Sequence, residues 1–132
     1  MKIKVGEYCR VNEDVRFLAI GIGKIVRIDI NEKYVYIEMK NKVLNALPMQ
    51  IEIKNIVKHS KNIIDLIEEG DYVNGYKVVK SNLESKKHGK YVDVYCPSQN
   101  LKLEFLEHVF AEQIRTIVTK EQFAQMQYLV KE

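Results

Sequence analysis

Apolar and polar residues alternate along most of the chain, in short runs separated by turn-forming residues. Such alternation is typical of strands that bury one face, and in the first half it predicts strands over 24–30, 33–40 and 50–54. The expected core positions of the first two runs are Val26, Ile28, Ile30, Val35, Ile37 and Met39. Ile25, Arg27 and Asp29 are then expected on the outer face.

The second half shows the same alternation, with clearer turn signals between the runs. Asn74-Gly75 favours the positive φ angles of a type I′ turn and predicts a hairpin between 71–73 and 76–80. Further strands are expected at 91–95, around Leu101, Leu103 and Phe105, and at 114–118 and 128–130, with Ser81–Gly89 as an exposed loop.

Two segments break the strand pattern and predict short helical structure. Thr119, with Gln122 three residues later, fits a helix N-cap and predicts a short helix near 120–126. Phe123 and Met126 would be its buried side. Residues 59–68 are too apolar for a free linker, and we expect a turn of helix there with Ile63, Leu66 and Ile67 facing inward.

The pattern glycine, acid, tyrosine opens both halves of the chain, as Gly6-Glu7-Tyr8 and again, 64 residues later, as Gly70-Asp71-Tyr72. Glycine permits the turn, and tyrosine starts the strand. The repeat therefore predicts two equivalent strand entrances. Each carboxylate is expected to accept hydrogen bonds from nearby backbone, an interpretation favoured over two acids that face one another across a pseudo-symmetric pair.

Together these patterns predict a mainly β protein. Residues 1–58 would form a small SH3-like β-barrel, residues 59–68 a packed connector, and residues 69–132 a second short β module with one short C-terminal helix. This is a binding-type scaffold in two halves.

Composition changes this picture mainly through charge. The net charge is +3, and it is unevenly spread: residues 1–66 carry 12 Lys/Arg against 8 Asp/Glu, whereas residues 67–132 carry 9 against 10. An attraction for anionic partners is therefore expected in the first half. No apolar run approaches the roughly 20 residues that cross a bilayer, and no signal peptide is evident, so we expect a cytoplasmic protein without membrane contact. Cys9 and Cys96 are expected to be buried thiols, not a disulfide.

Catalytic chemistry finds little support in the sequence. No phosphate loop, nucleophile elbow or zinc motif occurs. The histidines are scattered, and none has metal-ligand spacing to another His or Cys. We therefore expect no catalytic residues, no metal and no cofactor.

Binding is better supported, because Arg27, Tyr34 and Tyr36 would share one outer face. Tyrosine and arginine concentrate binding energy at interfaces. We call these three residues the Arg/Tyr face; another segment of the chain could instead cover them. Candidate contacts around them are Lys24, Lys40, Arg16 and Phe17. The segment Asn12–Ala19, which holds the last two, would either close the barrel or contact a partner.

Four stretches of the chain resemble small accessory proteins encoded by phages and prophages of low-GC Gram-positive bacteria. They are Val5-Gly6-Glu7-Tyr8, Gly21-Ile22-Gly23-Lys24-Ile25, the block Val57–Gly75 and Ile117-Val118-Thr119-Lys120-Glu121-Gln122-Phe123. The central block and the last stretch are the more specific. The resemblance implies origin more than activity, and it carries over no catalytic residue.

Such an origin implies a non-catalytic protein that acts in the cytoplasm of a bacterial host. Its partner would be a host protein or a ribonucleoprotein effector, and its effect would be to inhibit a defence system such as CRISPR–Cas. The alternative is a nucleic-acid or transcription-associated module that uses the basic first half, although Glu32, Glu38 and Glu52 interrupt that charge. The sequence sets no expectation for the oligomeric state.

Overall fold

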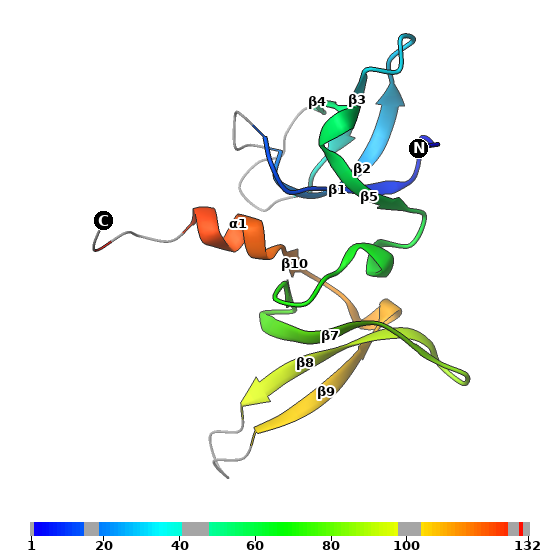
Figure 1. Cartoon of the computed structure of the whole chain (residues 1–132). Helices are drawn as coiled ribbons and strands as arrows, with labels where there is room; N and C mark the ends of the chain where they lie inside the picture. Colours follow the sequence, from blue (N-terminus) through cyan, green and yellow to red (C-terminus); the bar gives the residue numbers. More distant parts are fainter. Residues whose placement is uncertain (1, 15–18, 41–47, 98–103, 127–129, 131–132) are drawn as a thin grey trace. The chain divides into compact units, whose positions relative to one another are not determined.

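The chain forms two compact units, Met1–Leu66 and Ile67–Glu132. The computed structural model describes residues 2–14, 19–40, 48–97, 104–126 and 130 (Figure 1). Each unit contains a five-stranded antiparallel sheet, and a short α-helix follows the second sheet. The mainly β class is therefore confirmed. The boundary between the units falls inside the predicted connector 59–68, whose packing role stays a prediction.

The described residues of the first unit form one sheet and two short 3-10 helices. Its elements are β1 (Tyr8–Val11), β2 (Gly21–Ile28), β3 (Tyr34–Glu38), β4 (Met49–Glu52), η1 (Ile53–Asn55), β5 (Ile56–Ser60) and η2 (Ile63–Leu66). The strand order is β4-β3-β2-β1-β5, with β4 and β5 at the two edges. The sheet is not closed into a barrel. The expected closed barrel is thus wrong, and membership of the SH3-like group stays a prediction.

The second unit repeats this plan. Its elements are β6 (Tyr72–Val73), β7 (Tyr76–Ser85), β8 (Gly89–Pro97), β9 (Glu104–Phe110), η3 (Ala111–Gln113), β10 (Ile117–Val118) and α1 (Lys120–Gln125). The strand order is β10-β6-β7-β8-β9. Element by element, β6 to β10 correspond to β1 to β5, η3 corresponds to η1, and α1 takes the place of η2. The two halves therefore share one topology.

The glycine–acid repeat marks the same turn in both units. In the first unit the N–H of Glu7 donates to the Lys4 carbonyl at 3.2 Å, and Gly6 has φ +96°. In the second, the N–H of Asp71 donates to the Glu68 carbonyl at 3.1 Å, and Gly70 has φ +95°. Only glycine adopts such a φ without strain. The predicted equivalence of the two strand entrances is confirmed.

A β-bulge in β2 changes the expected alternation of the first sheet. Ile25 pairs with Ile37, but Arg27 pairs with Tyr36, so that Val26 is an extra residue in the strand. A bulge of this kind brings two residues of one strand opposite one residue of the other. Ile25 is consequently buried in the core, contrary to the expected outer position, while Arg27 remains on the outer face.

The same irregularity occurs at the equivalent place in the second sheet. Val78 pairs with Val94, but Lys80, two residues later, pairs with Asp93. Ile25 and Val78 are also equivalent in their turns: each donates its N–H to the carbonyl of the acid that follows the turn glycine, at 2.8 and 2.7 Å respectively. A shared bulge extends the correspondence from topology to residue register.

The cores combine predicted and unexpected positions. In the first unit Val35 and Ile37 are fully buried as predicted, and Met39 packs against the same cluster. Ile30 is 95% exposed, because β2 ends at Ile28 and the chain turns there, so its core assignment is wrong. The buried apolar residues of the second unit are Ile67, Val73, Val78, Val92, Val94 and Val109.

Short-range predictions in the second unit have mixed outcomes. The hairpin at Asn74-Gly75 is confirmed, with φ +52° and +87° at the two turn residues. The expected loop Ser81–Gly89 is wrong, because β7 continues to Ser85 and only a tight turn follows. The predicted strand at 114–118 is shorter than expected, at 117–118, and in the first unit the strand predicted at 50–54 lies at 49–52. Most of the expected strand 128–130 lies outside the described residues.

The helical segments lie where they were predicted, and of the predicted inward residues Leu66 and Ile67 are buried. Thr119 caps α1: its hydroxyl accepts from the Gln122 N–H at 3.1 Å, and the Gln122 side chain accepts from the Thr119 N–H at 2.9 Å. Phe123 and Met126 are 42% and 81% exposed, so their core assignment is wrong. Ile64 is buried in η2, while Ile63 is only half-buried.

Candidate functional site

Arg27 and Tyr36 form a stacked pair on the outer face of the first sheet. The guanidinium carbon of Arg27 lies 4.0 Å from the centroid of the Tyr36 ring. The bulge in β2 makes this possible, because it moves Arg27 directly opposite Tyr36. A guanidinium over an aromatic face is attracted by the ring quadrupole. The stack therefore holds both side chains in a defined orientation.

Tyr34 extends the same face by one step along β3. Residues two apart on a strand point to one side, so Tyr34 and Tyr36 face outward while Val35 between them is buried. Both tyrosines are half-buried, and Arg27 is exposed. The structure thus brings together the three residues of the Arg/Tyr face. Their role in binding stays a prediction.

The remaining predicted contacts are less closely associated with this face. Lys24 is exposed and pairs with Glu38 across the strands, and Lys40 is exposed beyond the end of β3. Arg16 and Phe17 lie outside the described residues. On the neighbouring strand, Glu52 forms an exposed ion pair with Lys54 at 3.0 Å. The rim of the Arg/Tyr face is consequently of mixed charge.

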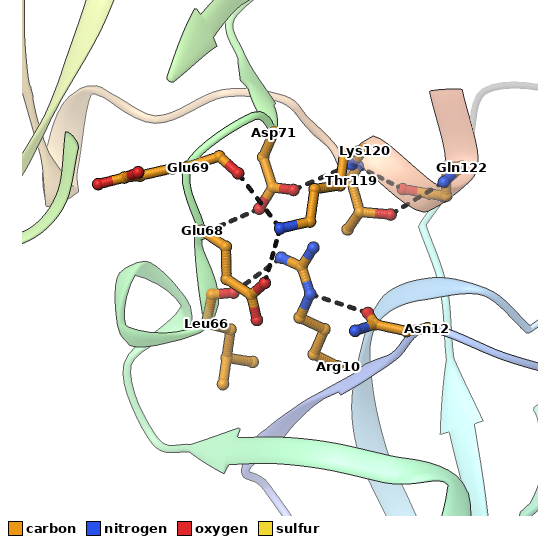
Figure 2. A network of polar contacts seen from close by, with 9 residues as sticks. All are labelled: Arg10, Asn12, Leu66, Glu68, Glu69, Asp71, Thr119, Lys120 and Gln122. Carbon is orange, nitrogen blue, oxygen red and sulfur yellow. Dashed lines mark hydrogen bonds and ion pairs between the residues drawn. The ribbon is translucent and has the colours of Figure 1, made fainter. Parts of the chain in front are cut away.

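Asp71 is the centre of a polar network that holds the second unit together (Figure 2). Its side chain is fully buried, and its two oxygens accept from the N–H groups of Glu68 at 2.7 Å and Lys120 at 2.9 Å. The Lys120 ammonium donates to the Glu68 carboxylate at 3.1 Å and to the Glu69 carbonyl at 3.3 Å. Asp71 therefore joins the entrance of β6 to the first turn of α1.

Glu7, the equivalent acid, uses its carboxylate in a similar way. It accepts from the Lys4 N–H at 2.7 Å, which matches the contact of Asp71 with the residue three positions earlier. Its second contact is different, because the Nδ1 atom of His59 lies 3.2 Å and 3.3 Å from its two oxygens. The expectation that both acids bind nearby backbone is confirmed, so we regard them as structural residues.

Arg10 is a buried charged residue that the sequence did not indicate. It is 0% exposed, and its guanidinium donates to the Leu66 carbonyl and to the Asn12 side chain, each at 3.0 Å (Figure 2). These bonds connect β1 to the end of η2 within the first unit. An arginine on a strand is ordinarily expected at the surface, and no spacing in the sequence signals its burial.

The two cysteines differ in environment. Both are free thiols; Cys9 is buried and Cys96 is half-buried, which corrects the expectation of two buried thiols. Burial raises the pKa of Cys9 to about 12. Because the thiolate is the reactive form, Cys9 is a core residue and not a nucleophile at neutral pH.

A depression of about 660 Å³ lies in the second unit and was not foreseen from the sequence. It is lined by Asn74, Glu107, His108, Val109, Glu112, Gln113, Arg115 and Thr116. The side chain of Asn74 is committed to structure there, since its oxygen accepts from the N–H groups of Arg115 and Thr116 at 2.7 and 3.1 Å. The lining residues come from separate segments, which explains why no sequence spacing revealed them.

The described residues provide neither a metal site nor a membrane-spanning helix. Among the described residues, no group of three or more His, Cys, Asp or Glu side chains is placed to hold a metal ion. No helix in the described part of the chain has the length and apolar character to cross a bilayer. Comparisons with family models, with curated proteins and with solved structures found no match to this chain.

Proposed function

We propose that this protein is a non-catalytic binding protein that contacts a host protein through its Arg/Tyr face. The observation that carries the proposal is the stack of Arg27 on Tyr36, with Tyr34 beside it, on the outer face of a sheet whose other face is core. A partner that covers this face gains large ring area and directional polar contacts. Side chains that are already ordered lose little conformational entropy on binding.

The identity of the partner is proposed from the sequence resemblance to phage accessory proteins. Proteins of that kind and size act by occupying a surface of a host macromolecule, and a defence complex such as a CRISPR–Cas effector is the partner we propose. This step depends only on the four stretches that resemble phage accessory proteins, and it is an argument by analogy. It is separate from the proposal that the Arg/Tyr face is the contact.

The test is capture of a host partner by wild-type protein and by a double variant. Arg27→Glu with Tyr36→Ala removes the stack and reverses one charge. A matched control, Arg115→Glu with Tyr76→Ala, makes the same chemical changes at two exposed positions of the second unit. We expect the first variant to lose the captured partner and the control to retain it, with circular dichroism unchanged in both.

Three outcomes would contradict the proposal. Equal capture by both double variants would show that the Arg/Tyr face is not the contact. If the first variant unfolds while Arg27→Glu alone folds and still captures the partner fully, the Arg/Tyr face is internal packing and not a binding site. Defence assays in which the protein has no effect while capture persists would reject the defence role but not the contact.

The alternative, nucleic-acid binding by the basic first half, makes a distinct prediction. Binding dominated by phosphates weakens steeply as salt rises, because condensed counterions are released. The carboxylates of Glu38 and Glu52 lie on the same outer face as the tyrosines, and they work against a continuous phosphate track. Affinity of the first unit's face for RNA or DNA that does not fall with salt would exclude this alternative.

A further inference from the structure

The basic residues of the second unit are concentrated in one hairpin. Five of the nine Lys/Arg residues in 67–132 fall between positions 77 and 90, where Glu84 is the single acid. They are Lys77, Lys80, Lys86, Lys87 and Lys90, and all five are exposed. The net charge of the whole second half, with its ten acids, conceals this local excess.

The hairpin formed by β7 and β8 presents Lys86 and Lys87 beyond the rest of the sheet, whereas Lys77 lies opposite Tyr72 and Lys80 opposite Asp93 within it. Its tip is shaped by Ser85, whose hydroxyl accepts from the N–H groups of Lys87 and His88, both at 3.3 Å. Strand β9 pairs with β8 only from Tyr91 onward, so among the described residues no third strand pairs with the tip (Figure 1). Lys86, Lys87 and His88 are therefore displayed at the end of a two-stranded ribbon.

A row of aromatic rings runs from the tip onto the sheet. The ring of His88 meets Phe110 edge-on at 5.5 Å, and Tyr91 lies 5.2 Å from Phe110 and 4.6 Å from His108 between ring centroids. Tyr91 and Phe110 are cross-strand partners, and both are half-buried, whereas the two histidines are exposed. We call Tyr91, His108, Phe110 and His88 the aromatic row.

The acids near the aromatic row are already engaged or flank it. Asp93 is buried and in contact with Nδ1 of His108. Glu84 lies opposite Lys90 in the strand register, on the face away from Tyr91. Glu107 and Glu112 line the same depression as His108, so acidic side chains also lie near the His108 end of the row. Lys90 also points away from the rings, whereas Lys80 lies opposite Asp93 on the ring-bearing face and Lys86 and Lys87 lie in the turn at the tip. These three lysines place positive charge beside the rings.

We propose that this hairpin and the aromatic row bind single-stranded nucleic acid. Aromatic rings can stack on unpaired bases, and the exposed lysines on β7 and at the hairpin tip can follow the phosphates. Bases inside a duplex are not available for stacking on a sheet face, so single strands are preferred. The proposal concerns the second unit and does not depend on the function proposed for the Arg/Tyr face.

The probes are labelled oligothymidine and oligouridine of about 20 nucleotides, with a duplex of the same length, measured by fluorescence anisotropy. With about four phosphate contacts and a slope near 0.7 for each, the affinity for single strands should fall roughly fifty-fold between about 50 and 200 mM salt. The duplex should bind more weakly than either single strand at every salt concentration.

Two variants separate the charge from the rings. Lys86→Glu with Lys87→Glu should weaken binding at least about tenfold and lower the salt slope by about 1.4. The control, Lys33→Glu with Lys61→Glu, makes the same charge change at exposed positions of the first unit and should leave binding nearly unchanged. Tyr91→Leu keeps apolar packing but removes a ring, and it should weaken binding about fivefold or more.

Several results would overturn the proposal. Absence of single-strand binding by the wild-type protein at low salt would do so directly. Equal or tighter binding of the duplex would refute base stacking by the aromatic row. An equal loss of affinity in the control variant would refute a specific role of the hairpin tip. Polyglutamate that binds as tightly as oligothymidine would assign the hairpin to an acidic protein surface instead. Tyr91→Leu with unchanged affinity and an unchanged circular dichroism spectrum would also refute base stacking.

Discussion

The substitution Asp71→Ala tests the network that the glycine–acid repeat creates. Asp71 is fully buried and accepts from two backbone N–H groups, those of Glu68 and Lys120, at 2.7 and 2.9 Å. Alanine removes both acceptors and leaves both donors without their partner. We therefore expect a loss of stability in the second unit together with release of the first turn of α1.

The size of the loss follows from the two bonds. A hydrogen bond to a charged group contributes about 1.5–3 kcal/mol, so two of them give roughly 3–6 kcal/mol for Asp71→Ala. Asp71→Asn keeps one acceptor oxygen but turns an amide N–H₂ toward the other donor, and it should lose roughly half as much. Glu7→Ala, which removes one such backbone contact at 2.7 Å, is the matched change in the first unit, with about 1.5–3 kcal/mol expected.

Amide hydrogen exchange gives the assay that localises the effect. In Asp71→Ala the amides of Glu68 and Lys120 should exchange roughly a hundredfold faster or more, since each 1.4 kcal/mol corresponds to about a factor of ten. Amides of β1 to β5 should keep their wild-type protection. In Glu7→Ala the pattern should reverse. Urea unfolding of Asp71→Ala within about 0.5 kcal/mol of the wild type, with Lys120 still protected, would refute the reasoning.

Two further predictions concern the thiols and the helix cap. Because the pKa of Cys9 is raised from 9.0 to about 12 in the folded state, the stability that its protonated form gives is complete below pH 9 and is lost as the pH rises toward 12. Between those values the free energy of unfolding in urea should fall by about 1.4 kcal/mol per pH unit, and this fall should be missing in Cys9→Ala. A thiol reagent at neutral pH should modify Cys96 alone, and rapid labelling of both cysteines would contradict this. Thr119→Ala should cost about 1 kcal/mol in urea unfolding, whereas Thr119→Ser should restore most of it; equal values for the two would mean that the cap bond to Gln122 contributes nothing.

Local signals in the sequence predicted local structure well. The turn at Asn74-Gly75 and the cap at Thr119 depend on the conformational preferences of two to four adjacent residues, and both were located correctly. The Gly6 and Gly70 turns depend in the same way on positive φ. Features of this kind can be read from a sequence because neighbouring residues alone decide them.

Features decided by more distant residues could not be read in the same way. The bulge at Val26 shifts the register of a whole strand, yet alternation in the sequence continues through it, so Ile25 was placed on the wrong face. The extension of β7 through Ser85 depends on pairing with β8, which polar composition does not reveal. The burial of Arg10 depends on the Leu66 carbonyl, 56 residues away.

The candidate site was predicted in part, and the reason lies in the same bulge. Alternation placed Tyr34 and Tyr36 on one face correctly, because β3 is regular there. Arg27 was also placed on that face, but its position opposite Tyr36 follows from the bulge and not from alternation. The aromatic row was missed because its residues come from the hairpin tip, β8 and β9, which only strand pairing brings together.

The shared register shows that the two proposed surfaces lie on corresponding strands and meet at one equivalent position, that of Tyr34 and Tyr91. Arg27 and Tyr36 follow the bulge in the first sheet, and Lys80 and Asp93 follow it in the second. Tyr34 and Tyr91 are likewise equivalent, since each lies three residues before the partner of the residue that precedes the bulge.

That equivalence would let one scaffold carry the two kinds of contact that we propose. In the first copy the position after the bulge holds a guanidinium stacked on a tyrosine, which suits a protein surface. In the second copy Asp93 replaces the tyrosine and holds His108, so that the ring surface moves to the neighbouring pair of Tyr91 and Phe110 beside the lysine hairpin. If each copy has its own partner, Arg27→Glu with Tyr36→Ala must leave oligonucleotide binding intact. Loss of both activities in that variant would mean that the two copies serve one common site.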